Sequence, residues 1–182
     1  LTGETRLMPH VHLSLQSGDN MILKRMKRRH SREQAIALVE RLKVRRPEIA
    51  VGADIIAGFP TEDDAMFANS LDLIEQCDIV HGHIFSYSPK QGTPAARMPQ
   101  LDGDVIKRRA KLLRNAVAGR ARSWRRTLIG TRQNVLAEMS GDTGYAANFA
   151  RVTFDAPASR GQIVPVEITG MQDKQLIGRV AA

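Results

Sequence analysis

The sequence predicts an α/β fold, in which strand–helix units build a parallel sheet and a small antiparallel β domain follows. Three observations predict it. Residues 10–16 alternate apolar and polar side chains, which is the periodicity of a strand. Apolar residues then recur at helical spacing after Ser31, and short β-prone runs separated by glycines fill the chain beyond Gly130.

The first half of the chain alternates strands with helices. Ser31 is a suitable N-cap for the first helix, which must end before Pro47. Thr61 has the right chemistry and position to cap the second helix. We expect strands at 10–16, 49–59 and 79–87, and helices at 31–46 and 65–76. Because strands alternate with helices, the strands are expected to be parallel.

The second half changes character. Residues 103–128 predict a long basic helix that connects two domains, with Trp124 packed between the helix and the β tail. Short β runs follow at 133–138, 145–154, 162–169 and 175–180. We therefore expect one domain over residues 1–126 and a second, antiparallel β domain over residues 127–182.

Composition limits the possible functions. The 182 residues carry a formal net charge of +8, which favours a polyanionic partner such as nucleic acid, although a solvated basic surface explains it equally well. No apolar run approaches the roughly 20 residues of a membrane span. The single cysteine, Cys77, allows neither a disulfide nor a cysteine-ligated metal site, and it favours a cytoplasmic setting.

Ligands of parallel α/β proteins bind at the carboxyl ends of the strands. The end of the second strand carries Gly58, Pro60 and Glu62, which either admit a flat ligand or only make a tight turn and begin a helix. The basic run at 24–30 is either a solvated surface or a contact for phosphate or carboxylate. His10 and His12 lack a third ligand in the sequence, so we assign no metal.

Three sequence blocks resemble one family. They are HVHLSLQSGDNMILKRMKRRHSRE at 10–33, ADIIAGFPTEDD at 53–64 and FSYSPKQGTPAARMP at 85–99. Together they resemble the radical S-adenosylmethionine methylthiotransferases. The resemblance implies the second half of a partial TIM-type barrel, followed by a TRAM domain, a small β-barrel that binds RNA. Ser14 stands where the isopentenyladenosine and ribosomal-protein branches more often have proline, so the threonylcarbamoyladenosine branch is the most similar.

The resemblance also implies a cofactor site. Ile56 and Gly58 would lie beside the adenine of S-adenosylmethionine, where a larger side chain than Gly58 would obstruct the ring. Thr61 departs from the family pattern, which has glycine there. The implied cofactor-binding residues are Gln16, Ser17, Arg28, Ile56, Gly58, Glu62, Tyr87 and Ser88.

The implied partner is the anticodon stem-loop of a tRNA. Basic side chains would contact phosphates, and Tyr145 or Phe149 would stack on bases. The expected RNA-binding residues are Lys107, Arg108, Arg114, Arg122, Arg126, Arg132, Tyr145 and Arg151.

The implied activity is the addition of a methylthio group to C2 of threonylcarbamoyladenosine beside the anticodon. The family holds 4Fe–4S clusters through a CxxxCxxC motif and further amino-terminal cysteines, which this chain lacks. We therefore expect an inactive carboxyl-terminal part whose amino-terminal half is missing. The alternatives are the isopentenyladenosine branch, the ribosomal-protein branch, a non-catalytic RNA-binding module, and an unrelated metabolic barrel enzyme.

Overall fold

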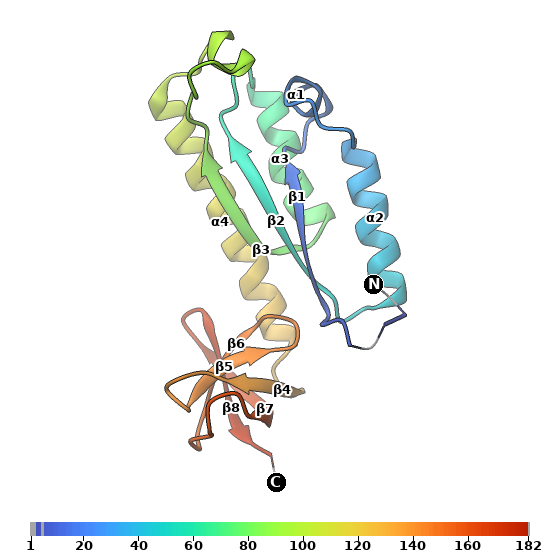
Figure 1. The fold of residues 1–182 in the computed structure, drawn as a ribbon, viewed down its shortest axis with the longest axis vertical. Helices are drawn as coiled ribbons and strands as arrows, with labels where there is room; N and C mark the ends of the chain where they lie inside the picture. The colour runs from blue at the N-terminus through green and yellow to red at the C-terminus, as the bar shows by residue number, and fades with distance from the viewer. Residues whose placement is uncertain (1–2, 5, 182) are drawn as a thin grey trace. The chain divides into compact units, whose positions relative to one another are not determined.

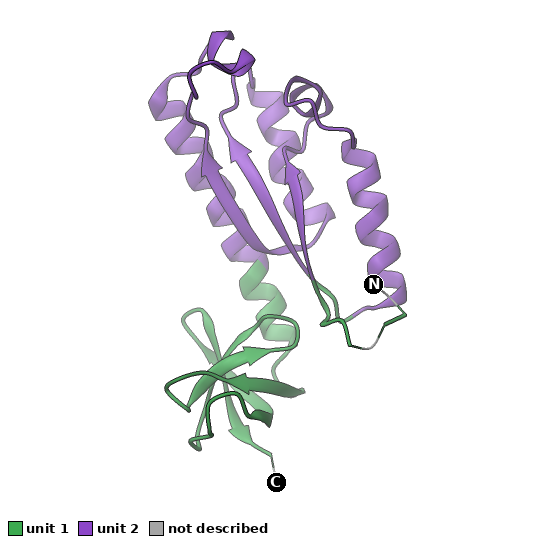
Figure 2. Ribbon diagram, in the orientation of Figure 1, with its two compact units in different colours: residues 1–10, 48–50, 121–182 green, residues 11–47, 51–120 purple. Residues whose placement is uncertain are grey.

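The computed structural model describes residues 3–4 and 6–181, and it divides into two compact units (Figure 2). One unit is an α/β layer over residues 11–47 and 51–120. The other contains a β-barrel and comprises residues 1–10, 48–50 and 121–182. The division falls between Arg120 and Ala121, inside one helix, whereas the sequence places the domain boundary after residue 126.

The α/β unit is built on a three-stranded sheet in the order β1–β2–β3. The three arrows point the same way in Figure 1, and β2 pairs with β3 in parallel, which confirms the predicted parallel sheet. The strands are β1 (His10–Gln16), β2 (Ala50–Ala57) and β3 (Ile79–Ser86); the helices are α1 (Asn20–Arg25), α2 (Arg32–Arg45), α3 (Asp64–Gln76) and α4 (Gly103–Thr127), with the short 3-10 helix η1 (Pro94–Arg97).

The helix caps agree with the sequence at α2 and disagree at α3. Ser31 caps α2 in a capping box with Gln34, as its chemistry predicts. The prediction that Thr61 caps α3 is wrong, because Asp63 accepts the hydrogen bond from the Met66 amide. Helix α1 was not predicted, and Asp19 caps it through two amide hydrogen bonds.

The hydrophobic core lies between the sheet and one layer of helices. Alternate β2 side chains (Val51, Ala53, Ile55 and Ala57) are fully buried and pack with apolar residues of α2, α3 and α4. Cys77 belongs to this core, as expected. The opposite face of the sheet therefore carries the intervening side chains, among them exposed polar residues.

Helix α4 is more than a connector. Ala110 and Leu113 are fully buried, and Val117 is nearly so, in the same core as the sheet. A Cβ atom at Gly82 of β3 would lie 2.6 Å from a methyl carbon of Val117, so strand and helix are closely packed. The helix therefore connects the two units, as expected, and its residues 103–120 are also part of the α/β unit.

The second unit contains a closed five-stranded barrel in the order β4–β5–β6–β8–β7. Its strands are β4 (Arg132–Ala137), β5 (Thr143–Ala146), β6 (Arg151–Phe154), β7 (Ile163–Gln172) and β8 (Gln175–Val180). The predicted strand at 145–154 is two strands joined by a turn. The barrel is also not wholly antiparallel, because β6 and β8 pair in parallel to close it.

The barrel has its own core, which includes Val135, Val152, Val166 and Leu176. Trp124 of α4 packs against it, as expected, and so does Leu128, just beyond the end of the helix. Among the helices of the described residues, none is long and apolar enough to cross a membrane.

Candidate functional site

A cavity of about 330 Å³ opens at the carboxyl ends of β1 and β2. Its volume is at the lower end of the range for small-molecule sites, about 300–1,000 Å³. Both strand ends and the basic segment after α1 contribute to it. The lining residues are Gln16, Arg25, Met26, Lys27, Arg28, Ile56, Phe59, Thr93, Pro94 and Ala95. The structure therefore brings together Gln16, Arg28 and Ile56, three of the residues predicted for the cofactor.

The side chains of Gln16 and Ser17, at the end of β1, lie in different surroundings. Gln16 lines the cavity and adopts a left-handed backbone conformation, with φ of 69°. Ser17 is buried instead against α3, where its hydroxyl lies 3.5 Å from that of Ser70. The Ser70 hydroxyl also accepts a hydrogen bond from the Gly18 amide at 3.0 Å. Ser17 thus holds the turn that presents Gln16, and it does not line the cavity.

Gly58 follows β2 and directly precedes Phe59, which lines the cavity. Its φ is +74°, which favours glycine, and an added Cβ atom would lie 2.6 Å from Cγ1 of Ile106 on α4. The resemblance attributes the glycine at this position to space for the adenine ring, whereas the structure explains it by the backbone conformation and the close contact with Ile106. A side chain at Gly58 would collide with the scaffold helix.

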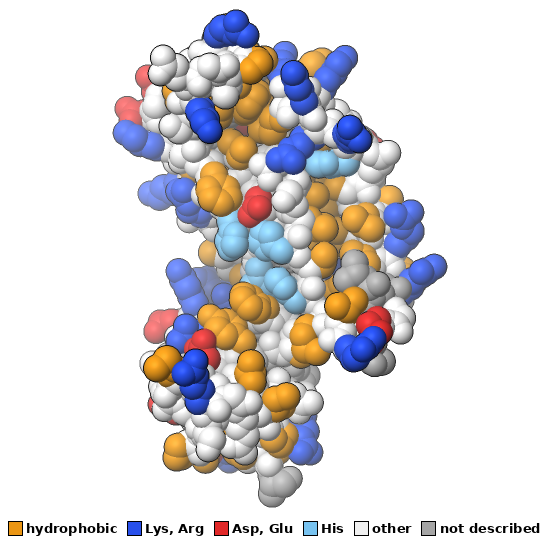
Figure 3. Space-filling model, in the orientation of Figure 1, with side chains coloured by type: hydrophobic (Ala, Val, Ile, Leu, Met, Phe, Trp, Pro, Cys, Tyr) orange, Lys and Arg blue, Asp and Glu red, His pale blue; other side chains and the backbone are white. Residues whose placement is uncertain are grey.

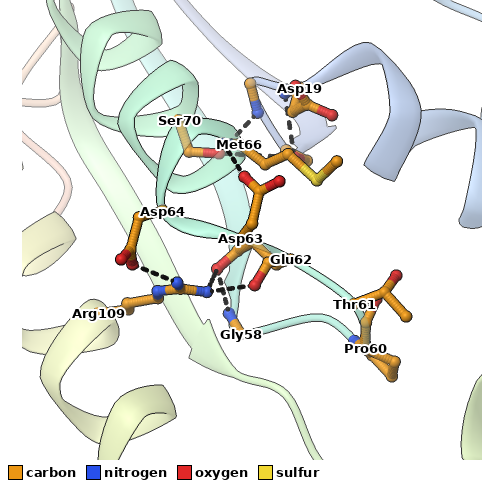
Figure 4. A network of polar contacts seen from close by, with 12 residues as sticks. Asp19, Gly58, Pro60, Thr61, Glu62, Asp63, Asp64, Met66, Ser70 and Arg109 are labelled. Atoms are coloured by element: carbon orange, nitrogen blue, oxygen red, sulfur yellow. Dashed lines mark hydrogen bonds and ion pairs between the residues drawn. The ribbon is translucent and has the colours of Figure 1, made fainter. Parts of the chain in front are cut away.

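Glu62 forms a buried polar network at the start of α3, shown in Figure 4. Its carboxylate accepts hydrogen bonds from the Gly58 amide at 3.2 Å and from Arg109 Nη1 at 2.8 Å. Arg109 also donates to the Glu62 carbonyl at 2.8 Å and to Asp64 Oδ1 at 2.6 Å. Its guanidinium lies 5.3 Å from the ring centroid of Phe67. The network locks the turn after β2 onto α4.

The charges of Glu62 and Arg109 are almost fully removed from water, with side chains 1% and 5% exposed. Burial raises the pKa of Glu62, and the neighbouring Arg109 partly opposes this rise. Glu62 does not line the cavity. Its carboxylate is paired with Arg109 inside the protein.

Thr61 lies beside this network and has a φ of 68°. Its carbonyl accepts a hydrogen bond from Arg25 Nη1 at 3.4 Å, which links the turn after β2 to the basic segment lining the cavity. The family pattern has glycine here, and the left-handed backbone explains why: glycine adopts it without steric cost. The loop keeps this geometry despite the threonine.

Tyr87 and Ser88 follow β3 and differ in environment. The Tyr87 ring packs edge-on against Phe59 at 5.3 Å between centroids, and Phe59 lines the cavity. The Tyr87 hydroxyl is buried without a hydrogen-bond partner among the described residues. Ser88 is exposed in the loop that follows. Tyr87 thus supports the cavity wall from behind, while Ser88 does not contribute to the lining.

The cavity has the chemistry of a site for a nucleoside joined to a carboxylate. Ile56, Phe59 and Met26 offer apolar and aromatic surface, and Arg25 and Arg28 offer guanidinium groups. These residues fit S-adenosylmethionine. A 4Fe–4S cluster does not fit this chain: it needs several thiolates, and Cys77 is fully buried with its pKa raised to about 11.

The basic residues of α4 fall into two groups, apart from the half-buried Arg125, which donates to the Lys174 carbonyl at 3.1 Å. Arg109 is buried in the network above, Arg114 donates to the Ile84 carbonyl at 3.1 Å, and Arg120 pairs with Asp78. The second group is exposed and comprises Lys107, Arg108, Lys111, Arg122 and Arg126. Of the predicted RNA contacts on α4, Arg114 is therefore partly engaged by the scaffold although it is itself exposed.

The predicted RNA contacts of the barrel form a stack. The rings of Tyr145 and Phe149 lie 4.8 Å apart, and Phe149 lies 5.0 Å from His10 of the same unit. Arg151 covers Tyr145 at 5.8 Å from the ring centroid. Neighbouring side chains therefore lie against both faces of Phe149. Arg132 is exposed on β4.

Sequence reasoning missed several lining residues. The sequence predicts Phe59 at the end of a strand and residues 93–95 in a loop, and it assigns neither to the cofactor site. The basic run at 24–30 was the available signal for Arg25 and Lys27, since it follows the first strand end directly.

Comparison with known proteins supports one class. Residues 3–74, which contain β1, β2 and the cavity residues from Gln16 to Phe59, match the model described as the Radical SAM superfamily. This part of the chain is therefore similar to that superfamily.

Over most of its length the chain is also similar to proteins named as tRNA-modifying enzymes. It is 44% identical over 168 residues to the threonylcarbamoyladenosine tRNA methylthiotransferase MtaB of Rickettsia prowazekii, covering 92% of this chain and 40% of that protein. It is 36% identical over 181 residues to the tRNA-2-methylthio-N(6)-dimethylallyladenosine synthase of Cereibacter sphaeroides, covering 96% and 42%. The chain thus spans about two fifths of the length of these curated relatives.

Proposed function

We propose that this chain is the carboxyl-terminal part of a tRNA methylthiotransferase that adds a methylthio group to C2 of threonylcarbamoyladenosine beside the anticodon. The observation that carries the proposal is the 44% identity to the relative of that name, across 92% of this chain. The relatives named for dimethylallyladenosine are 35–37% identical over comparable lengths. The proposed substrate is a tRNA, so the proposed place of action is the cytoplasm.

The proposed cofactor site is the cavity at the ends of β1 and β2. Ile56 and Phe59 would bind the adenine, Gln16 would hydrogen-bond the ribose or methionine moiety, and Arg28 would pair with the carboxylate. Gly58, Glu62 and Ser17 would act as positioning residues beneath the site, with Tyr87 behind it. When bound beside a reduced 4Fe–4S cluster, S-adenosylmethionine supplies a radical for hydrogen abstraction.

A 4Fe–4S cluster needs several cysteines, and these 182 residues contain one. We therefore propose that cysteines of the amino-terminal half hold the cluster. We propose that residues 1–126 complete a partial TIM-type barrel with that half, and that residues 127–182 form a TRAM-like domain. On this proposal the chain alone binds the cofactor and the anticodon stem-loop but performs no methylthiolation.

Binding of S-adenosylhomocysteine to the chain, measured by calorimetry, tests the proposed cavity. The stable analogue is expected to bind the chain, and Arg28→Gln is expected to weaken binding at least about tenfold, because one charge-assisted hydrogen bond contributes about 1.5–3 kcal/mol. Arg29→Gln is the matched control, since Arg29 is adjacent, exposed and absent from the lining. No binding by a folded chain would leave an RNA-binding module as the function.

Analysis of tRNA nucleosides by mass spectrometry tests the substrate. A strain that lacks the full-length gene is expected to lose 2-methylthio-threonylcarbamoyladenosine and to regain it on complementation. Loss of the dimethylallyl product instead would assign the chain to the isopentenyladenosine branch, and a change in a ribosomal protein would assign it to the third branch.

A further inference from the structure

Three polar side chains meet on the open face of the sheet, outside the cavity described above. They belong to three neighbouring strands: His12 to β1, Asp54 to β2 and His83 to β3. His12 Nε2 lies 2.9 Å from Asp54 Oδ1, and His83 Nδ1 lies 3.2 Å from the same oxygen. The two imidazole centroids are 4.7 Å apart. Figure 3 shows histidine side chains gathered on one face of the molecule, with an acidic side chain beside them.

The sheet itself produces this convergence. Asp54 and His83 are direct partners in the parallel pairing of β2 with β3, so their side chains project from the same face. The neighbouring alternate residues of β2, Ala53 and Ile55, are fully buried under the helices on the other face. Strands hold ligands more precisely than loops do, so the three groups are positioned by the fold.

Gly52 makes room for one of the imidazoles. A Cβ atom at this position would collide with Nδ1 of His12, so the ring lies directly over the glycine backbone. Any other residue at Gly52 would displace the ring, and Nε2 with it. The glycine therefore fixes the imidazole in the orientation that directs Nε2 at Asp54.

We propose that His12, Asp54 and His83 bind a divalent transition-metal ion, with Zn²⁺ as the first candidate. Their nitrogen and oxygen donor atoms all lie within 4.8 Å of one another, and two imidazoles with one carboxylate are a donor set for zinc or ferrous iron. A tetrahedral ion with bonds of about 2.0–2.1 Å requires small movements of these side chains. His12 and His83 are exposed, so the remaining coordination position faces away from the sheet.

The competing arrangement is a hydrogen-bonded cluster in which Asp54 accepts an N–H from each imidazole. The two arrangements differ in the tautomer of each imidazole, because a nitrogen that binds a metal ion uses its lone pair and the imidazole proton then stays on the other ring nitrogen. Protonation of imidazole competes with metal binding.

Titration of the 182-residue chain with Co²⁺, after removal of metals by a chelator, tests the site by visible absorption. One equivalent is expected to bind, with competition by Zn²⁺. Asp54→Asn and His83→Gln are each expected to weaken binding at least about tenfold. His81→Gln is the matched control, because His81 lies two residues away on the same strand and outside the triad.

His83 is well exposed, with 66% of its side chain accessible, so its substitution is expected to leave the fold intact, as circular dichroism would verify. An absent Co²⁺ spectrum at neutral pH, or equal binding by His83→Gln and the unmodified chain, would overturn the metal site. The site is independent of the proposed methylthiotransferase activity, so failure of one leaves the other unaffected.

Discussion

Thr61 holds a backbone conformation that is costly for a β-branched residue. Its φ of 68° lies in the left-handed region, where such side chains carry a strain of about 1–3 kcal/mol. Thr61→Gly is expected to raise the free energy of unfolding by about 1 kcal/mol, since the flexibility of glycine offsets part of the relief. Chemical denaturation measures this. Thr93→Gly is the control: φ there is −86°, so a similar gain would contradict the strain.

Arg109 neutralises a carboxylate that water does not reach. Arg109→Met is expected to lower the free energy of unfolding by about 3–5 kcal/mol, because it leaves Glu62 buried and unpaired. Lys107→Met is the control. Its pair with Asp104 is exposed, so its loss is expected to change the free energy of unfolding by less than about 1 kcal/mol.

The same variant has an expected pH signature. Burial raises the pKa of Glu62 in the folded state, so the folded chain binds this proton more tightly than the unfolded chain does. Stability from this group is therefore full below the unfolded pKa, about 4.3, and falls as pH rises through the raised folded pKa. Without Arg109 the fall is expected to be larger. Denaturation at pH 5 and pH 8 measures it; a pH-independent effect would contradict it.

Single residues show what sequence could and could not reveal about the site. Gln16, Arg28 and Ile56 were predictable, because the family resemblance assigns them to the cofactor site and the strand ends and the charge run that carry it are visible in the sequence. The inward burial of Ser17 and Glu62 was not, since it depends on Ser70 and Arg109, which are distant in the sequence. For the same reason Asp54 gave no sign of its two histidine neighbours.

Substitutions of Asp63 test how much the N-cap stabilises helix α3. Asp63→Ala is expected to lower the free energy of unfolding by about 1 kcal/mol, because the Met66 amide loses its acceptor. Asp63→Asn keeps a capping oxygen and is expected to lose only a few tenths of a kcal/mol. Urea denaturation compares them. Equal losses in the two variants would show that the cap itself contributes little.

Whole elements were predicted well where periodicity alone determines them. The strands of the α/β unit and the helices α2 and α3 follow from strand and helical periodicity, whereas the six-residue helix α1 is too short to show it. Local chemistry could not decide between Thr61 and Asp63 as the cap of α3, because both are good N-caps and only the backbone of the turn distinguishes them. Likewise, the many arginines of α4 made it hard to predict from the sequence that Ala110, Leu113 and Val117 are buried.

At the scale of the whole molecule, excess positive charge predicts salt-dependent RNA binding. The chain is expected to bind an anticodon stem-loop with an affinity that falls as salt rises. Arg108→Gln and Arg122→Gln are each expected to reduce the slope of log affinity against log salt by about 1, because each removes an exposed phosphate contact. Fluorescence anisotropy across a salt series measures the slopes.

Arg45→Gln serves as the control for this series, because Arg45 is an exposed cation on α2 rather than α4. It is expected to leave the slope unchanged. An equal reduction by all three variants would indicate a diffuse response to net charge, without a defined RNA surface on α4.

The order of strands in the barrel has a consequence for protein synthesis. The last strand to be translated, β8, lies between β6 and β7 and closes the ring. Until β8 has left the ribosome, β6 and β7 each expose an unpaired edge, and such edges pair readily with other chains. A slow codon or a stalled ribosome just before β8 would therefore prolong the most aggregation-prone stage of the nascent barrel.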